Sequence, residues 1–186
     1  LSALEQDITL GAAILSQNGY RLRALYVGGG TPTVLTAEEL RRLLSHALAA
    51  YNGFGREFTV EAGRPDSISA EKLRALKHLG VTRVCINPQT MNDETLARIG
   101  RRHTAADIRS AFALARDTGF QDINMDLIAG LPGEDFPMFE ETLGSVLALS
   151  PESVTVHTLS VKRSSDMHRF GDALPEGRVV EDMVAL

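Results

Sequence analysis

A run of three glycines is the first stretch of this chain with a chemical use. Gly28, Gly29 and Gly30 follow a short strand-like stretch, and Thr31 and Pro32 come next. Glycine tolerates positive φ and lets a ligand approach the backbone more closely than a Cβ would allow. The proline restricts its own φ and the conformation of the residue before it. The sequence therefore favours a loop that binds a ligand through its backbone, although an ordinary turn between a strand and a helix can have the same composition.

Other candidate side chains follow further strand-like stretches along the chain. They include the carboxylates Glu61 and Asp126 and the amide Gln89. The segments that carry them are 61–65, 87–90, 126–134 and 157–163. Ligands of strand–helix barrels bind at the carboxyl ends of the strands, so these groups should meet at one rim. Such a rim could bind a ligand with an amine, hydroxyls and a heterocycle. The signatures of serine hydrolases, His-Glu-x-x-His metalloproteases and Gly-Lys-Ser phosphate loops do not occur in the sequence.

Composition limits the possible classes of protein. With 186 residues, of which 44% are hydrophobic and 23% charged, the chain suits one soluble globular core. Its net charge of -5 argues against nucleic acid or an anionic membrane as a partner, and no apolar run has transmembrane length. The lone cysteine, Cys85, excludes a disulfide framework and is typical of a reducing compartment, so we expect a cytoplasmic protein. Because the chain starts at Leu1 and ends within a helical pattern, we expect a piece of a longer protein.

Strand and helix patterns alternate along the chain. Helix starts are indicated by N-caps at Thr36, Ser69 and Asp135, and Gly80 and Gly119 end two helices. Strands are predicted at 22–27, 57–61, 81–86, 123–128 and 154–157, with amphipathic helical patterns between them. Repeated strand–helix units build a parallel sheet, which is either an open doubly wound sheet or a barrel.

The faces of the strands favour the barrel. Phe58 and Val60 alternate with Thr59 and Glu61, and later strands show the same alternation of apolar and polar residues. Strands of an open parallel sheet, which helices cover on both faces, are more uniformly apolar. A full eight-stranded barrel needs about 250 residues, so we predict an α/β fold with about five parallel strands of an incomplete barrel. We place the barrel core at 1–161 and the start of a C-terminal extension at 162–186.

Five motifs, in order along the chain, resemble the radical S-adenosylmethionine (SAM) superfamily. The resemblance spans roughly residues 25–163 and points to the oxygen-independent coproporphyrinogen III oxidases, also called coproporphyrinogen dehydrogenases, in their HemZ-type branch. The motifs are Tyr-Val-Gly-Gly-Gly-Thr-Pro-Thr, Thr-Val-Glu-Ala-Gly-Arg-Pro-Asp, Ile-Asn-Pro-Gln-Thr-Met-Asn, Ile-Gly-Arg-Arg-His-Thr and Asn-Met-Asp-Leu-Ile-Ala-Gly-Leu-Pro-Gly-Glu. The second and third depart from the commoner patterns Glu-x-x-Pro and Gly-x-Gln-Ser. The resemblance implies a partial (β/α)6 radical SAM barrel without its first strand.

The resemblance also implies a set of SAM-binding residues. Its members are Gly29, Gly30, Thr31, Glu61, Gln89, Arg101, Asp126 and Ser160. The glycines, the threonine and the glutamate would lie at the methionyl end, and Arg101 would bind the SAM carboxylate in a charge-assisted pair. The glutamine would hydrogen-bond the nucleoside, Asp126 would accept from the ribose hydroxyls, and Ser160 would approach the adenine through its backbone.

For the whole protein, the resemblance implies a step of haem biosynthesis. The 5′-deoxyadenosyl radical from SAM would take a hydrogen from propionates of coproporphyrinogen III, which then lose carbon dioxide and become vinyl groups. The implied partners are this tetrapyrrole and an electron donor for a [4Fe-4S] cluster. The family holds the cluster in a Cys-x3-Cys-x2-Cys loop, which this chain lacks, so we expect no metal ligands and no activity from this chain alone. Residues 1–18 would form the helix that follows that loop.

Two other functions are compatible with these motifs. A haem chaperone of the same superfamily would keep the barrel and the SAM loops but carry haem without converting it. An unrelated strand–helix barrel could use the loop at 28–33 to bind phosphate.

The implied SAM residues have structural alternatives. Glu61 and Asp126 could pair with Arg83 inside the barrel or accept hydrogen bonds from backbone donors, since buried carboxylates are rarely unpaired. Gln89 could cap the turn that follows it. Arg101 could be a solvated charge like its neighbour Arg102.

Other chemically capable side chains are expected to be structural. Cys85 lies between apolar residues of a strand and should pack as a small hydrophobic residue. His103 and His157 are expected to be hydrogen-bonded histidines without a role in proton transfer.

The strand predicted at 22–27 would have an unpaired edge in a barrel without its first strand. Unpaired strand edges favour association with another chain. We therefore expect the chain to self-associate along this edge or to shield it with residues 1–18.

Overall fold

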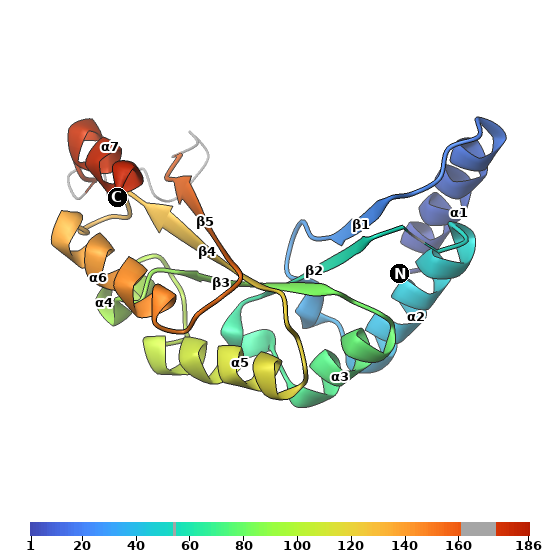
Figure 1. Ribbon diagram of the computed structural model, residues 1–186, viewed down its shortest axis with the longest axis horizontal. Helices are drawn as coiled ribbons and strands as arrows, with labels where there is room; N and C mark the ends of the chain where they lie inside the picture. Colours follow the sequence, from blue (N-terminus) through green and yellow to red (C-terminus); the bar gives the residue numbers. More distant parts are fainter. Residues whose placement is uncertain (54, 161–173) are drawn as a thin grey trace.

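One parallel sheet organises the molecule. The computed structural model describes residues 1–53, 55–160 and 174–186. The strands follow one another in the order β1-β2-β3-β4-β5, and all neighbours are parallel. Their bounds are β1 (Ala24–Val27), β2 (Glu57–Gly63), β3 (Arg83–Gln89), β4 (Ile123–Ala129) and β5 (Ser153–Thr158). The sheet curves into an open arc, which confirms the incomplete barrel (Figure 1).

The helices cover the convex side of this arc and leave its concave side open (Figure 1). The helices up to the middle of the chain are α1 (Ser2–Gln17), α2 (Ala37–Ala50), α3 (Ala70–His78) and α4 (Asp93–Arg98). They are followed by α5 (Ala105–Asp117), α6 (Phe136–Leu147) and α7 (Gly177–Ala185). Two short 3-10 turns, η1 (Pro32–Val34) and η2 (Pro65–Ser67), lie just after β1 and β2. The loops at the carboxyl ends of the strands therefore line one rim.

The helix ends follow the predicted caps. Thr36, Ser69 and Asp135 each accept a hydrogen bond from the backbone three residues later, and Thr36 forms a capping box with Glu39. Gly80 has a φ of +83°, in the left-handed region that commonly ends a helix. These local signals fix where each helix begins and ends, and hence the lengths of the rim loops.

Apolar side chains from alternate strand positions pack under the outer helices. Phe58, Val60 and Met125 are fully buried there, whereas Glu61 and Asp126 on the other face stay half-buried. The same core includes Leu40, Leu44, Leu73, Leu76, Ile108, Phe112 and Phe139 from the helices. The predicted alternation is confirmed, and it leaves the polar face of the sheet toward the concave side.

Two strands extend two or three residues further toward the rim than the sequence predicts, whereas β4 and β5 extend by only one. β2 continues to Gly63 and β3 continues to Gln89, so part of each predicted loop is sheet. β3 also starts two residues later than predicted, at Arg83. The amide of Val81 instead donates to the carbonyl of Leu76 and helps to end α3. Sheet hydrogen bonds thus fix the backbone that carries the candidate side chains of β2 and β3.

The last helix packs back onto the barrel. α7 contacts α6, β4 and β5, and its Met183 is buried in the common core. The predicted boundary at 161/162 adjoins residues 161–173, which lie outside the described residues, and it stays a prediction.

The first strand, β1, is an edge of the sheet. Its partner on one side is β2, and α1 packs mainly against α2, where Glu5 and Arg42 form an ion pair of 2.6 Å. Self-association along the open edge stays a prediction.

Candidate functional site

The glycine loop closely contacts the side chains beside it. A Cβ on Gly28 would lie 2.6 Å from Cε1 of Tyr26 and 2.8 Å from Cδ of Glu61, so only glycine fits there. Gly29 has a φ of +111°, and a Cβ on Gly29 or Gly30 would meet no other atom within 4 Å. The loop therefore has one closely packed glycine followed by two whose backbone is open to a ligand.

Buried polar groups hold the end of this loop in place. Thr33 is fully buried, and its hydroxyl donates to the carbonyl of Ala62 and lies 2.5 Å from the hydroxyl of Ser67. The ammonium of Lys72 donates to the carbonyls of Thr33 and Ser67. These contacts attach the loop after β1 to the segment after β2. A loop fixed in this way is preorganised for binding.

A cavity of about 240 Å³ lies beside the open glycines. It is lined by Gly30, Thr31, Gly63, Arg64, Asn87 and Arg101. The pairing of β2 with β3 shifts register between Glu61 and Gly63, and Gly63 has a φ of +67°. A Cβ on Gly63 would lie 2.9 Å from Cγ2 of Thr31, so the close contact of these two segments also requires glycine. The cavity thus joins the loops that follow β1 and β2.

The structure distinguishes between the two adjacent arginines. Arg101 lines the 240 Å³ cavity and is half-buried, whereas Arg102 is exposed. Burial lowers the pKa of Arg101, the charge of Arg64 lowers it further, and Asp66 acts in the opposite direction. Arg101 therefore lies where it could bind an anionic group.

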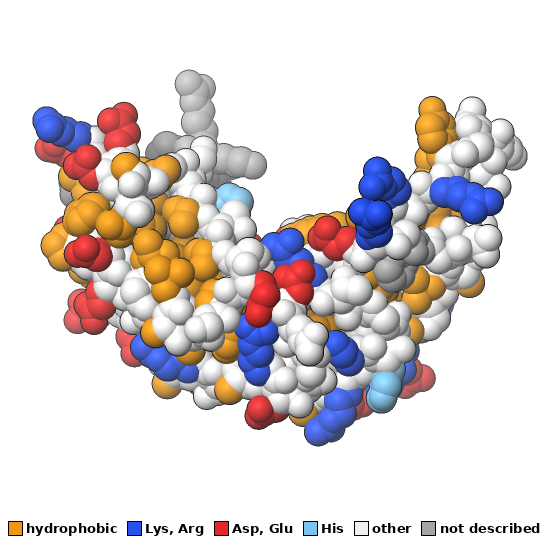
Figure 2. Space-filling view, in the orientation of Figure 1, with side chains coloured by type: hydrophobic (Ala, Val, Ile, Leu, Met, Phe, Trp, Pro, Cys, Tyr) orange, Lys and Arg blue, Asp and Glu red, His pale blue; other side chains and the backbone are white. Residues whose placement is uncertain are grey.

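A second cavity, of about 220 Å³, lies on the concave face of the sheet. Its lining is polar and consists of Tyr26, Glu57, Thr59, Arg83, Cys85, Asn124, Asp126, Thr155 and His157. The amide nitrogen of Asn124 donates to Asp126 at 2.5 Å, and the phenol of Tyr26 donates to Glu61 at 2.5 Å. Burial and the hydrogen bond to Glu61 raise the pKa of Tyr26, so the phenol stays protonated. Figure 2 shows acidic and basic side chains close together near the bottom of the open concave side.

Arg83 does not form an ion pair with Glu61 or Asp126, as one purely structural role of these carboxylates would require. Its guanidinium lies 3.9 Å from Glu57 and 3.6 Å from Asp122, and it donates to Ser153 at 2.8 Å. Glu61 and Asp126 are held instead by a phenol and an amide, which leaves their negative charges without an ion pair among the described residues. These two carboxylates are available to a cationic or hydroxyl-bearing ligand.

Gln89 ends β3 in an unusual backbone conformation. Its φ is +71°, in the left-handed region that residues other than glycine rarely adopt, and the residue is 8% exposed. It lines neither of the two rim cavities, and Asn92, not Gln89, caps the following helix. Gln89 therefore does not cap that helix, and its role as a cap of the turn before the helix stays a prediction. The contact that the family resemblance implies for its side chain stays a prediction.

A buried carboxyl holds the loop after Gln89 against the loop after β4. Glu134 is 3% exposed, and Thr90 donates to its Oε1 at 2.5 Å. Burial raises the pKa of Glu134, and hydroxyl groups of Thr90 and Thr95 oppose the shift. Arg98 adds a bond of 3.0 Å to the carbonyl of Pro132. The loop that follows β4 is thereby attached to the segment that follows Gln89.

The remaining candidates lie at the margins of the site. Ser160 is exposed, next to Leu159, whose amide donates to the carbonyl of Ala129 at 2.9 Å. His103 is 3% exposed, and neither ring nitrogen has a hydrogen-bond partner of normal geometry in the described residues, although the backbone of Pro88 is close enough to raise its pKa, so its expected hydrogen bonding is not confirmed. Burial lowers its pKa, followed by the charge of Arg101. His103 is thus a neutral histidine buried beside the cavity.

The chain offers no iron ligands in the part that the structure describes. No group of three or more His, Cys, Asp or Glu side chains is placed to hold a metal there. Cys85 is buried in β3, where burial, and then Asp126, raise its thiol pKa to about 11. A protonated thiol in the sheet does not fit a thiolate-held cluster.

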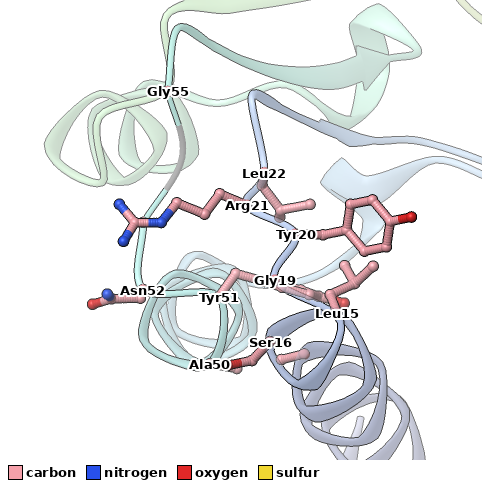
Figure 3. A pocket seen from close by; sticks show the side chains of 12 residues that line it. Leu15, Ser16, Gly19, Tyr20, Arg21, Leu22, Ala50, Tyr51, Asn52 and Gly55 are labelled. Atoms are coloured by element: carbon pink, nitrogen blue, oxygen red, sulfur yellow. The ribbon is translucent and has the colours of Figure 1, made fainter.

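The largest of these three cavities, about 520 Å³, lies elsewhere (Figure 3). It is enclosed by the C-terminal ends of α1 and α2 and by the segment leading into β1, with Tyr20, Arg21 and Tyr51 among its lining residues. This is the amino end of the strands, opposite the glycine loop. We take the rim and the adjoining concave face as the candidate site, because the open glycines and Arg101 lie at the rim and Glu61 and Asp126 face the concave side.

Comparison with known proteins identifies the family. The sequence model of the radical SAM superfamily matches residues 5–146. The chain belongs to the radical SAM superfamily. This family uses SAM and a [4Fe-4S] cluster, and the open glycine backbone, the carboxylates and the arginine cavity fit SAM. The residues that the structure describes do not fit the cluster.

The similar proteins carry two kinds of name: coproporphyrinogen III oxidase or oxidase-like protein, and heme chaperone. The chain is 44% identical over 179 residues to the oxygen-independent coproporphyrinogen-III oxidase-like protein HemZ of Bacillus subtilis, covering 92% of this chain and 36% of that protein. It is 38% identical over 164 residues to the heme chaperone HemW of the same organism, covering 87% of this chain and 42% of that protein. The structure of coproporphyrinogen III oxidase (HemN) from Escherichia coli matches with a TM-score of 0.85 and 28% identity, covering 100% of this chain and 43% of that one.

Several site residues were not singled out from the sequence. Tyr26, Arg64, Asn87 and Glu134 all lie within the recognised motifs, but their contacts join segments that are far apart in the chain. For Arg64 and Asn87, the departure from the commoner family patterns was the signal in the sequence that could have marked them as site residues. None of the helices in the described part of the chain is long and apolar enough to span a bilayer.

Proposed function

We propose that this chain is the SAM-binding part of an oxygen-independent coproporphyrinogen III oxidase. The whole protein would oxidatively decarboxylate propionates of coproporphyrinogen III to vinyl groups in haem biosynthesis, in the cytoplasm, with electrons from a separate donor. The main support is one arrangement, in which the open glycines, the Arg101 cavity, Glu61 and Asp126 share the rim and the concave face. The similarity to HemZ and to the HemN structure supports coproporphyrinogen III as the substrate.

The residues of the chain would bind and orient SAM, which supplies the oxidising chemistry when bound. The backbone at Gly29, Gly30 and Thr31 would receive the methionyl group, and Arg101 would bind its carboxylate. Glu61 would lie near the same end and attract the positive charges of the cofactor. The closely packed Gly28 and the anchored Thr33 support this, because a loop that cannot shift holds its ligand in one position.

The remaining residues would bind the nucleoside. Asp126 would accept hydrogen bonds from the ribose hydroxyls, and its hydrogen bond to Asn124 holds the carboxylate toward the concave face. Gln89 would contact the nucleoside, and Ser160 would approach the adenine through its backbone. The tetrapyrrole would lie against the open concave side of the sheet, next to this nucleoside site (Figure 1).

A second candidate is a haem chaperone that binds haem without converting it. The 38% identity to HemW favours it, since the rim residues could bind SAM in either protein. The two functions differ in what happens to the tetrapyrrole.

The experiment is an anaerobic assay of the full-length protein with a reconstituted cluster, a reductant, SAM and coproporphyrinogen III. The oxidase proposal predicts protoporphyrinogen and 5′-deoxyadenosine. Stoichiometric haem binding with neither product would identify the chaperone instead. A matched reaction without SAM controls for non-enzymatic oxidation of the porphyrinogen.

A further inference from the structure

Two guanidinium groups share the cavity beside the glycine loop. Arg64 follows β2, and Arg101 follows α4, yet both line the same 240 Å³ space with Gly30 and Asn87. Among the ion pairs of the described residues, none involves Arg64 or Arg101. Asp66 is close enough to favour the charged form of Arg101, but it lies nearer to His103, 4.0 Å from its Nδ1. The cavity is therefore lined by two positive charges that repel each other, and a bound anion would reduce this repulsion.

The amide of Asn87 provides a third group in the same cavity. Its Oδ1 is buried and accepts no hydrogen bond within the described residues. A buried acceptor without a donor is costly, and a ligand that donates a hydrogen bond removes this cost. A ligand that carries both an anionic group and an N–H donor, such as the amino acid end of SAM, would satisfy all three side chains.

Arg64 and Asn87 are also the places where this sequence departs from the commoner family patterns. The Glu-Ala-Gly-Arg-Pro stretch has one residue more than Glu-x-x-Pro, and the structure accommodates it by the register shift between Glu61 and Gly63. A bulge of this kind redirects the side chains next to it. Asn87 stands where Gly-x-Gln has glycine, which carries no side chain. Both departures fall on one cavity, next to the arginine that the family resemblance assigns to a carboxylate.

We propose that Arg64 and Arg101 form a two-guanidinium site for a carboxylate, and that Asn87 accepts a hydrogen bond from the same ligand. Guanidinium groups bind carboxylates through paired N–H donors, so two of them can bind both oxygens. The carboxylate belongs to the methionyl end of SAM or to a propionate of the tetrapyrrole. The first source rests on the proposed function. Arg64 is then a specificity-determining residue of this branch.

The test compares Arg64→Gln, Arg101→Gln and Asn87→Ala with the matched control Arg102→Gln in the full-length protein. Arg102 is the exposed neighbour of Arg101, so its removal changes the net charge without touching the cavity. Calorimetry measures the Kd for SAM, for decarboxylated SAM, which lacks the carboxylate, and for coproporphyrin III. Thermal unfolding of each variant checks that it is folded.

If the carboxylate is that of SAM, Arg64→Gln raises the Kd for SAM about tenfold or more and leaves the Kd for decarboxylated SAM unchanged. Asn87→Ala weakens both compounds, because both keep the ammonium. If the carboxylate is a propionate, Arg64→Gln weakens coproporphyrin III alone. A protein that binds coproporphyrin III through Arg64 but does not bind SAM supports the inference and contradicts the proposed function.

The inference is overturned if folded Arg64→Gln matches Arg102→Gln for all three compounds. If the wild-type protein binds SAM in that experiment, the proposed cofactor still stands. Failure of the wild-type protein to bind any of the compounds would contradict both.

Discussion

The hydroxyl of Tyr26 donates a 2.5 Å hydrogen bond to Oε1 of Glu61, and this contact joins β1 to β2 across the concave face. Tyr26 is 58% exposed, so its ring is held by this bond and by contact with Gly28 more than by burial. The bond fixes the position of a carboxylate that has no ion pair in the described residues. Tyr26 therefore acts as a positioning residue for Glu61.

Replacing this phenol tests that role. Tyr26→Phe keeps the ring but removes the donor, so Glu61 loses a hydrogen bond and gains freedom. A hydrogen bond to a charged group contributes about 1.5–3 kcal/mol, and we expect SAM affinity to fall roughly tenfold with little change in thermal stability. Tyr20→Phe, at a 68% exposed tyrosine, is the matched control. Equal SAM affinity in both variants would show that Tyr26 does not position Glu61.

The close packing of Gly28 leads to a prediction about the glycine loop. Gly28→Ala places a methyl group 2.6 Å from the ring of Tyr26, so the ring or the loop must move. We expect a loss of about 1–3 kcal/mol in the free energy of unfolding and weaker SAM binding.

Gly144→Ala is the control for this substitution, because a Cβ there meets no atom within 4 Å on α6. It should stabilise the protein by about 0.5–1 kcal/mol through helix propensity. Chemical denaturation measures both variants. If Gly28→Ala unfolds like the wild type and binds SAM equally well, the loop is not closely packed in solution.

The burial of His103 predicts a dependence of stability on pH. Its pKa is lowered in the folded state, so the unfolded state binds a proton more readily. The stability that the neutral histidine contributes is present above its ordinary pKa of about 6.5 and is lost as pH falls through that value. We expect the free energy of unfolding to decrease from pH 7.5 to pH 5.5, with a slope of no more than about 1.4 kcal/mol per pH unit from this group.

His103→Gln should remove this part of the pH dependence, whereas His157→Gln, at an exposed histidine, should leave it in place. Urea unfolding at several pH values measures the slope. A slope that is the same in all three proteins would assign the pH dependence to other groups.

Local sequence signals predicted much of the fold. Thr36 and Ser69 cap helices as expected because a cap needs only residues within one turn. The alternation of Phe58 and Val60 with Glu61 predicted the polar concave face, because a strand turns successive side chains to opposite sides. The ends of β2 and β3 were harder to place, since sheet pairing with a neighbouring strand extends them past the residues with strand propensity.

The contacts of the site depend on residues far apart in the sequence. The bond from Thr90 to Glu134 spans 44 residues, and the meeting of Arg64 with Arg101 depends on the register shift in β2. Composition and periodicity do not distinguish Arg101 from its neighbour Arg102, and only the family resemblance pointed to Arg101. The path of the loop after Gly100, which has a φ of +73°, directs Arg101 to it.

The central claim is that SAM binds at the rim. Hydrogen–deuterium exchange of the full-length protein, with and without SAM, tests it most directly. We predict slower exchange at the backbone of 28–31 and 61–64 with SAM, and unchanged exchange at 16–22 and 50–53, which line the largest cavity at the other end of the strands. Protection confined to 16–22 and 50–53, or none at 28–31, would contradict the account.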